Sequence, residues 1–421
     1  MINVNRHEKL KSLVKLAREK SPFYRELYRD VDIEKFQLEN LLIVDQEKFW
    51  AANTVCNNQL LTGKVEDGIV LKSGGTTGHP KFSVYTKSEW EMFTKIFGEG
   101  LDQSNLANGD RVANLFYSGE LYASFIFIMK SLEYAKTPVI HYPITGKCPD
   151  SSLLEMIQDL NINVLAGVPT SFMHLASLVR GKNFKLPVEK ILYGGEGLYQ
   201  DQREVLEDCF PNVTISSIGY ASVDGGHLGY VDKTCLPGEH ACFNQYSIME
   251  LLDENTNEPI EKNGVVGKLV YTNLERTLMP IIRYPVGDLA KWTKVGEKFL
   301  LQGRSEVGAR VGPVTVNRDD FSDILKSYPR KNLIMGFQVI IEHENKKDFL
   351  IWRIASDSGN VELLRQDQEL LYQLFSKEKK MYKESVEMGL IGDIQIQICG
   401  YEDLVRNRRT GKLRNVVDRR N

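Results

Sequence analysis

Cysteine is scarce in this sequence: there are six residues in 421, and no two of them form a Cys-x-x-Cys pair. This spacing matches neither a disulfide framework nor a clustered thiolate metal site, so we expect a reduced, cytoplasmic setting. Long apolar runs are missing as well, because none approaches the ~18 residues that suggest a membrane-spanning helix. The first residues carry charge at Arg6, Glu8 and Lys9, where a secretory signal would be apolar. We therefore expect neither a membrane span nor a secretory signal.

An excess of one charge is also lacking. Lysine and arginine number 53 against 56 acidic residues, which gives a net charge of -3. This balance offers no general reason to expect a nucleic-acid partner or an anionic membrane surface. The 42% hydrophobic and 26% charged fractions exclude wholesale disorder. At about 150 residues per domain, the length predicts two or three domains.

Helical and strand patterns divide the chain into regions. An amphipathic helix is expected over residues 10–20, and it ends at Ser21-Pro22 because a residue before proline avoids the helical conformation. Short apolar runs then alternate with helical stretches, which favours a mostly parallel sheet. These runs are residues 68–71, 112–116, 137–140, 163–166 and 190–193.

Beyond about residue 235, strands follow one another with short turns, and the glycines of 303–312 form the best hinge candidate. We predict an α/β fold with a large N-terminal domain, residues 1–303, built from several subdomains. Mostly parallel sheets flanked by helices would be joined there by a small β-rich subdomain at about 235–303. A small, mobile α+β C-terminal domain would follow over residues 304–421.

The segment from Leu71 to Lys81 carries the most specific chemistry. It places three glycines and three hydroxyl side chains after an apolar strand and ends in a lysine. Glycines let backbone N–H groups turn toward an anion, and the hydroxyls and lysine add donors and charge. The composition favours a phosphate cradle, with a Gly/Thr-rich surface turn as the alternative. The loop is not a Walker A motif, because no Gly-Lys-Ser/Thr ends it.

Four weaker motifs accompany this loop. Each one is also compatible with ordinary turn chemistry when it is taken alone. Residues 279–288 suit a carboxylate at a strand end, and residues 190–197 suit the close approach of a flat ligand. Residues 219–226 suit an aromatic face beside a carboxylate for Mg²⁺, and residues 409–412 place a lysine on a glycine turn.

Two further possibilities are weighed against these motifs. Cys235, His240 and Cys242 approximate a zinc site, but their spacing is not a standard one, and small core cysteines are the favoured alternative. The absence of a Gly-x-Ser-x-Gly elbow argues against a serine hydrolase.

Taken together, the order and spacing of the five motifs resemble the adenylate-forming superfamily of acyl-CoA synthetases, adenylation domains and luciferases. Within it, the chain is most similar to the phenylacetate-CoA ligase branch, which also begins with a helix ending in a Pro-Phe-Tyr signature, here Pro22-Phe23-Tyr24. The resemblance spans residues 8 to 420. It implies an enzyme that uses ATP and Mg²⁺, with CoA as the second substrate.

The resemblance also implies roles for individual residues. Lys412 would be the mobile catalytic lysine, and Asp224 would hold Mg²⁺. ATP would be bound by Ser73, Gly75, Thr76, Thr77, Gly78, Lys81, Gly195, Glu196, Tyr220, Ser222, Asp288 and Arg304. The acid would lie against Phe116, Tyr117, Glu120, Tyr122, Val168 and Pro169. The alternative for the three aromatic residues is that they belong to the hydrophobic core, and the alternative for Glu120 is that it faces solvent.

The sequence departs from the family pattern at three positions. Val223 lacks the usual hydroxyl that touches the α-phosphate, and Asp224 is one methylene shorter than the usual glutamate. Either Ser222 compensates or the phosphate contact is weaker. Glu306 stands at the hinge, where aspartate or lysine is usual.

We therefore predict ATP-dependent activation of an aryl or planar carboxylic acid to acyl-AMP with release of pyrophosphate. Transfer to a thiol, most readily CoA, would follow. A carrier protein, a protein side chain or an amine is an alternative acceptor, and a non-catalytic nucleotide-binding homologue is a further alternative. The acid itself and the oligomeric state, including a homodimer, stay open.

Overall fold

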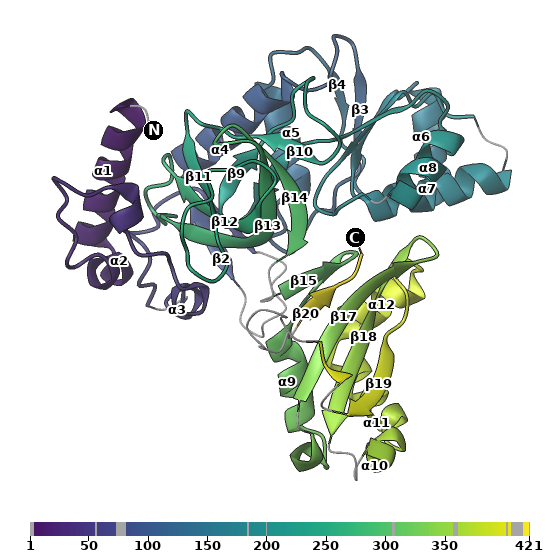
Figure 1. Ribbon diagram of the computed structural model, residues 1–421. Coiled ribbons are helices and arrows are strands. Elements are labelled where there is room, and N and C mark those ends of the chain that lie inside the picture. The colour runs from purple at the N-terminus through teal and green to yellow at the C-terminus, as the bar shows by residue number, and fades with distance from the viewer. Residues whose placement is uncertain are drawn as a thin grey trace. The chain divides into compact units, whose positions relative to one another are not determined.

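The computed structural model describes most of the chain. The described residues are 4–54, 57–72, 81–182, 185–198, 200–304, 308–334, 336–356, 361–400, 403–405 and 416–420. They form two compact units, one containing the described residues up to Gln302 and the other those from Gly303 onward. Figure 1 shows the elements of each unit. None of the helices in the described part of the chain has the length and apolar character needed to cross a bilayer.

The N-terminal segment is helical and belongs to the first unit. Helix α1 (Val4–Lys20) buries the predicted apolar stripe of Leu10, Leu13, Val14 and Ala17 and ends before Pro22, which confirms the expected helix. Helix α2 (Pro22–Leu27) follows directly, because the Ser21 side chain accepts from the Tyr24 N–H and caps it. A 3-10 turn, η1 (Leu38–Asn40), and helix α3 (Gln46–Ala51) complete this segment.

A five-stranded parallel sheet forms the centre of the first unit. Its order is β4-β3-β5-β6-β7, and every neighbouring pair is parallel. The strands are β3 (Arg111–Asn114), β4 (Ile140–Tyr142), β5 (Val164–Gly167), β6 (Lys190–Tyr193) and β7 (Thr214–Ser217). Strand β4 begins later than residues 137–140 predicted, and it leaves out Pro138, which has no N–H for a ladder.

Helices cover both faces of this sheet. Alternate strand residues enter two separate cores, as the two-residue period of a strand requires. One core takes Val112 and Val164 together with side chains of α4 (Lys87–Leu101) and α5 (Ser124–Tyr134). The other takes Ala113 and Leu165 with side chains from three more helices. These are α6 (Asp150–Asp159), α7 (Pro169–Lys182) and α8 (Gln200–Cys209).

The strand order of the parallel sheet reverses between β3 and β5. From β3 the chain passes outward to β4, then returns to the other side of β3 for β5, β6 and β7. In open α/β sheets, ligands bind outside the carboxyl ends of the strands at such a reversal. The loops after β3 and β5 therefore flank a natural binding position.

A second sheet of five strands has the order β10-β14-β13-β12-β11. Strands β10 and β14, β11 and β12, and β12 and β13 pair antiparallel. The strands are β10 (Glu239–Ala241), β11 (Ser247–Leu252), β12 (Val266–Asn273), β13 (Tyr284–Lys294) and β14 (Lys298–Arg304). The N-terminal helices share its core through residues such as Tyr24, Phe49 and Tyr271.

Two short strand pairs accompany these sheets in the first unit. Strands β1 (Ile69–Lys72) and β2 (Phe82–Tyr85) pair antiparallel on either side of the predicted phosphate loop. Strands β8 (Tyr220–Ser222) and β9 (Gly226–Gly229) pair antiparallel around Asp224.

The second unit is a small α+β fold. A hairpin of β15 (Gly308–Val311) and β16 (Val314–Asn317) leads to α9 (Arg318–Lys326) and the 3-10 turn η2 (Lys331–Leu333). A sheet in the order β19-β18-β17-β20 follows. Its strands are β17 (Gly336–Glu344), β18 (Lys347–Ser356), β19 (Gln395–Gly400) and β20 (Val416–Asp418), with helices α10 (Val361–Arg365), α11 (Gln368–Glu378) and α12 (Lys380–Glu387) between β18 and β19. The fully buried Trp352 packs in the core of this unit.

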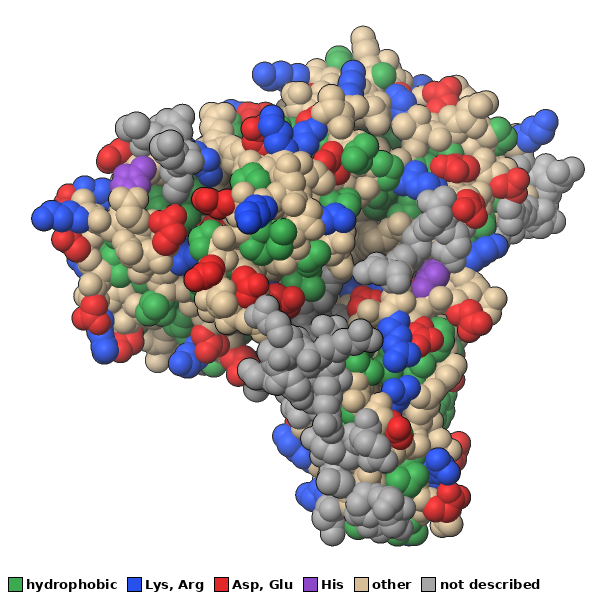
Figure 2. Space-filling view, viewed as in Figure 1, with side chains coloured by type: hydrophobic (Ala, Val, Ile, Leu, Met, Phe, Trp, Pro, Cys, Tyr) green, Lys and Arg blue, Asp and Glu red, His purple; other side chains and the backbone are tan. Residues whose placement is uncertain are grey.

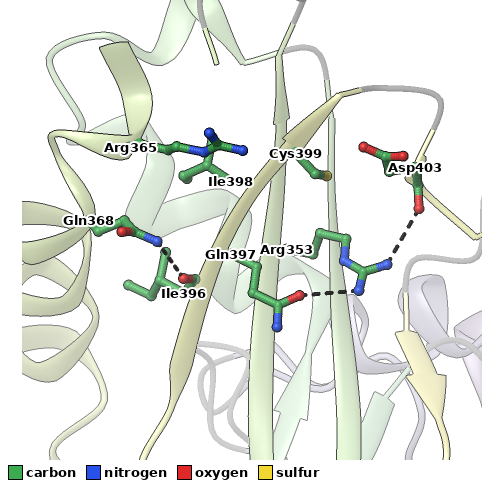
Figure 3. A pocket seen from close by; sticks show the side chains of 8 residues that line it. All are labelled: Arg353, Arg365, Gln368, Ile396, Gln397, Ile398, Cys399 and Asp403. Carbon is green, nitrogen blue, oxygen red and sulfur yellow. Dashed lines mark hydrogen bonds between the residues drawn. The ribbon is translucent and has the colours of Figure 1, made fainter. Parts of the chain in front are cut away.

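An open hollow of about 590 Å³ lies beside the edge strand β19 in this second unit. Arg353 donates there to Gln397 Oε1 at 3.1 Å and to the Asp403 carbonyl at 3.4 Å, while Gln368 donates to the Ile396 carbonyl (Figure 3). No residue predicted from the sequence lines it. The hollow is therefore formed by residues outside every predicted motif.

Candidate functional site

Two of the predicted motifs meet at Tyr220 and Asp288. The Tyr220 hydroxyl, on β8, donates a hydrogen bond to Oδ2 of Asp288, on β13. The Tyr220 ring also lies against Phe299 of β14, with centroids 6.1 Å apart. An aromatic face and a carboxylate are thus held side by side, and both are only partly buried. This pair suits a ligand that combines a flat ring with neighbouring hydroxyls.

Asp288 lies at an irregularity inside β13, so the expectation of a strand end is wrong. The register between β12 and β13 shifts between Lys268 and Val270, opposite the segment from Pro285 to Leu289. Gly287 has a φ of 85°, a conformation that disfavours any other residue. Such bulges redirect side chains beside binding sites.

A second contact joins the third motif to the same strand. Tyr284, which begins β13, donates through its hydroxyl to Oδ2 of Asp224 at 3.1 Å. The same hydroxyl accepts from Trp50 Nε1 at 2.9 Å and from Gln46 Nε2 at 3.1 Å. Burial raises the pKa of Tyr284 well above its usual value, and the nearby Asp224 raises it further. The phenol therefore stays protonated and holds the carboxylate of Asp224.

Lys81 extends this group of side chains toward the phosphate loop. Its Nζ lies 5.3 Å from the centroid of the Trp50 ring, within the range of a cation–π contact. Lys81 is the first described residue after the predicted cradle, immediately before β2. A cation thus lies close to the aromatic side chain that supports Tyr284 and, through it, Asp224.

The Ser222 hydroxyl is engaged in the turn that carries Asp224. Its Oγ accepts from the N–H of Gly225 at 2.8 Å. The hydroxyl therefore shapes this turn and keeps its own proton for donation. Since Val223 has no hydroxyl, Ser222 is the one hydroxyl side chain among the described residues 222–225.

The predicted acid-binding segments lie at the reversal of the parallel sheet. Phe116 follows β3, Val168 follows β5, and Gly194 and Gly195 follow β6. A Cβ added at Gly194 would lie 3.5 Å from the Phe116 ring, and one at Gly195 would lie 3.7 Å from Val168. Gly195 has a φ of 80°, so glycine is required there. Three strand ends thus bring these segments together, with Pro169 next to Val168 at the start of α7.

The aromatic side chains of this region differ in exposure. Phe116 is buried in the core, which favours the structural alternative for that residue. Tyr117 and Tyr122 are half-buried. Glu120 is exposed, which favours the alternative that its side chain faces solvent, and its backbone φ is 51°.

Several predicted residues cannot be placed. Ser73, Gly75, Thr76, Thr77, Gly78 and Lys412 lie outside the described residues, as does Glu306 at the hinge. Arg304 ends β14, but its side chain is not described. Glu196 follows Gly195 in the loop after β6 and is half-buried.

The zinc interpretation gains no support. His240 Nε2 shares a hydrogen bond of 3.1 Å with Ser217 Oγ, and Lys298 donates to Cys235 Sγ at 3.5 Å. Burial raises the pKa of Cys242 to about 12, which keeps its thiol protonated. In the described part of the chain, no three His, Cys, Asp or Glu side chains group as metal ligands. A Mg²⁺ site needs fewer protein ligands than a zinc site, because Mg²⁺ is bound through one or two carboxylates together with substrate phosphates. Asp224 offers one such carboxylate.

Sequence reasoning missed Tyr284, Trp50 and Gln46, whose contacts support Asp224. Tyr284 could have been predicted, because it belongs to the same motif as Asp288. The others lie outside every motif and reach the site only through the folded chain.

No family model matches the chain, but curated proteins and solved structures resemble it. The chain is 24% identical to a phenylacetate-coenzyme A ligase of Thermus thermophilus over 359 residues, which covers 81% of this chain and 78% of the relative. It is also 24% identical to an indoleacetate–lysine synthetase of Pseudomonas savastanoi, over 65% of this chain and 66% of that relative.

The same architecture is found in the crystal structure of 2-hydroxyisobutyryl-CoA ligase in complex with 2-HIB-AMP and CoA. The TM-score is 0.74 at 17% identity, with 98% of this chain and 89% of that chain covered. The likeness establishes the fold and confirms the predicted α/β class. The chain thus shares this fold, and it is similar over most of its length to curated phenylacetate-coenzyme A ligases.

Proposed function

We propose that this protein is an enzyme that activates a carboxylic acid with ATP, releasing pyrophosphate, and then transfers the acyl group to CoA. The observation that carries the proposal is the convergence of Tyr220, Asp224 and Asp288. The Tyr220 hydroxyl bonds Asp288, and Tyr284 of the same strand bonds Asp224. The relation to phenylacetate-coenzyme A ligase supports the reaction type.

The first step joins two anions. One oxygen of the acid forms a bond to the α-phosphorus of ATP, and the bond between that phosphorus and the leaving pyrophosphate breaks. Because anions repel, the site must concentrate positive charge and donors where the phosphate changes hands. Tyr220 and Asp288 would hold the base and ribose, while Lys81, the N–H groups of residues 73–80 and Lys412 would face the phosphates. Bound Mg²⁺ at Asp224 would supply further charge stabilisation.

The acid would bind at the reversal of the parallel sheet, beside the strand ends that carry Val168 and Gly195. The half-buried Tyr117 and Tyr122 favour an aryl or otherwise planar acid. Phe116 would support this surface from the core rather than line it.

The second step needs a nucleophile. The CoA thiol would attack the acyl carbon and release AMP after the C-terminal domain rotates about residues 303–312. Its pantetheine arm would pass the β15–β16 turn, where Val311 and Val314 are buried and Gly312 has a φ of 52°.

An amine is the second candidate acceptor. The observation that favours it is the relation to indoleacetate–lysine synthetase, whose name joins an aryl acid to an amine. The activated acid would be the same in both cases, and only the attacking group would differ.

Acid-dependent exchange of labelled pyrophosphate into ATP tests the proposal. A panel of aryl and alkyl acids should produce exchange with at least one aryl acid, and mass spectrometry with CoA or lysine present should identify the acceptor. Lys412→Ala should lower the exchange rate about a hundred- to a thousandfold while ATP still binds. A protein that binds ATP but exchanges with no acid would be a non-catalytic homologue.

A further inference from the structure

The turn that carries Asp224 is held through its backbone. Three of its carbonyl groups, and that of His227 in the following strand β9, each accept a hydrogen bond from a different buried side chain. Tyr85 donates to the Val223 carbonyl at 2.6 Å, Arg276 to that of Asp224, Asn273 to that of Gly225 at 2.9 Å and Tyr271 to that of His227 at 2.5 Å. All four donors are at most 3% exposed. The turn is therefore fixed from the protein side, independently of any ligand.

Arg276 is the unusual member of this group. Its side chain is 1% exposed, and its guanidinium lies 4.0 Å from the centroid of the Tyr85 ring. Within the described residues it has no carboxylate at ion-pair distance, and its Nε has no hydrogen-bond partner. A buried charge without a counter-ion costs several kcal/mol, so an arginine is a poor choice for packing alone.

The segment after Arg276 is fixed as firmly. Oε1 of the buried Glu89 accepts from the N–H of Thr277 at 2.6 Å and from the N–H of Leu278 at 2.7 Å. Oε2 of Glu89 accepts from the N–H of Thr86 at 2.9 Å, at the end of β2. Arg276 and Tyr85 thus stand on one rigid frame built from β2, α4 and the chain after β12.

We propose that Arg276 and Tyr85 are positioning residues of the nucleotide site, a role that rests on the proposed function. They hold the Val223–Asp224 backbone so that the Asp224 carboxylate is presented to a divalent cation and its nucleotide. The Arg276 charge also makes this turn more favourable for anions, which offsets the missing hydroxyl of Val223. The site is thereby preorganised, with Tyr284 fixing the carboxylate and Arg276 and Tyr85 fixing the backbone beneath it.

The test measures Mn²⁺ bound to the protein in the presence of ATP, without acid, by equilibrium dialysis with the protein on one side of the membrane. Tyr85→Phe keeps the ring and removes one donor, whereas Arg276→Met removes the charge. Since outer contacts of a metal ligand typically contribute 10- to 100-fold in affinity, each variant should weaken Mn²⁺ binding by about that factor. ATP affinity without the metal should change less.

Two comparisons separate positioning from general damage. Tyr28→Phe is the matched control, because Tyr28 is equally buried and donates to a backbone carbonyl, that of Leu42, away from the turn. It should leave Mn²⁺ binding unchanged. In an Asp224→Ala background, Tyr85→Phe should add no further loss, because the two residues act on the same ligand.

Unchanged Mn²⁺ affinity in Tyr85→Phe and Arg276→Met, or an equal loss in the Asp224→Ala background, would overturn the positioning role alone. If Arg276→Met fails to fold, the Mn²⁺ affinity of Tyr85→Phe still tests the positioning role. If the unaltered protein does not bind ATP with Mn²⁺ at all, the proposed function fails and this inference fails with it.

Discussion

Asp288 and Tyr220 form the residue contact on which nucleotide binding is proposed to depend. If Asp288 binds the ribose hydroxyls, Asp288→Ala removes hydrogen bonds to a charged group, which contribute about 1.5–3 kcal/mol. ATP affinity should then fall about 10- to 100-fold. Isothermal titration with ATP and with 2′,3′-dideoxy-ATP checks the role. The unaltered protein should bind ATP more tightly than the dideoxy analogue, and Asp288→Ala should bind both alike. A preference for ATP that survives the substitution would contradict the role.

Tyr284 gives a residue-scale prediction about stability. Tyr284→Phe leaves Trp50 Nε1 without its acceptor and Asp224 without this donor, whereas Gln46 Nε2 keeps the Pro285 carbonyl. A buried group left unsatisfied costs about 1–3 kcal/mol, so urea unfolding should show a loss of that size. Trp50→Phe added to Tyr284→Phe should cost less than the two single losses combined, because the variants share one contact. Strict additivity would show that the hydrogen bond does not couple them.

The residues predicted from the sequence and those missed differ in how they are encoded. Tyr220, Asp224 and Asp288 each lie in a contiguous motif whose glycines and polar groups indicate a ligand. Trp50 and Arg276 contact the site across 234 and 52 residues of sequence. Their local patterns indicate an ordinary helix and an ordinary loop, so their roles depend on tertiary packing that a single sequence does not contain.

At the scale of elements, strands β9 and β10 each bury a histidine. Burial lowers the pKa of His227 to about 3 and that of His240 to about 4. The unfolded chain protonates histidine near pH 6.5. Between about pH 6.5 and 4 the unfolded state therefore binds protons that the folded state does not. The two buried histidines therefore contribute fully to the free energy of unfolding above pH 6.5, and this contribution is lost as the pH falls through this window.

Urea unfolding between pH 6.5 and 5 measures this effect, since most carboxylates stay ionised there. His227→Phe should reduce the slope of the free energy of unfolding against pH by up to about 1.4 kcal/mol per pH unit. The slope is compared, rather than the absolute stability, because phenylalanine also changes the packing. An unaltered slope would mean that His227 is protonated in the folded protein.

The pattern of elements was more predictable than their edges. Alternating apolar runs and helical stretches predicted the parallel sheet because each strand buries both faces, as all four residues of β5 do. The bulge at Asp288 was not predictable, since Gly-Asp is compatible with either a turn or an irregular strand. The reversal between β3 and β5 also depends on strand order, which periodicity does not determine.

At the scale of the whole molecule, the proposal requires the C-terminal domain to take two positions, one for each step. The predicted domain boundary and the hinge at 303–312 remain predictions. Glu306→Pro should stiffen the hinge, because proline fixes one backbone angle. We expect acyl-AMP formation within tenfold of normal and thioester formation slowed at least a hundredfold. Rapid-quench measurement of acyl-AMP and acyl-CoA in one turnover checks this, and equal slowing of both steps would argue against a hinge at this position.

The central claim is that an oxygen of the acid becomes bonded to the α-phosphorus of ATP. An aryl acid labelled with ¹⁸O in its carboxylate, incubated with ATP, Mg²⁺, CoA and the enzyme, tests it directly by mass spectrometry of the products. The account predicts AMP carrying one ¹⁸O atom, together with unlabelled pyrophosphate. Labelled inorganic phosphate with ADP, or AMP without the label, would contradict it.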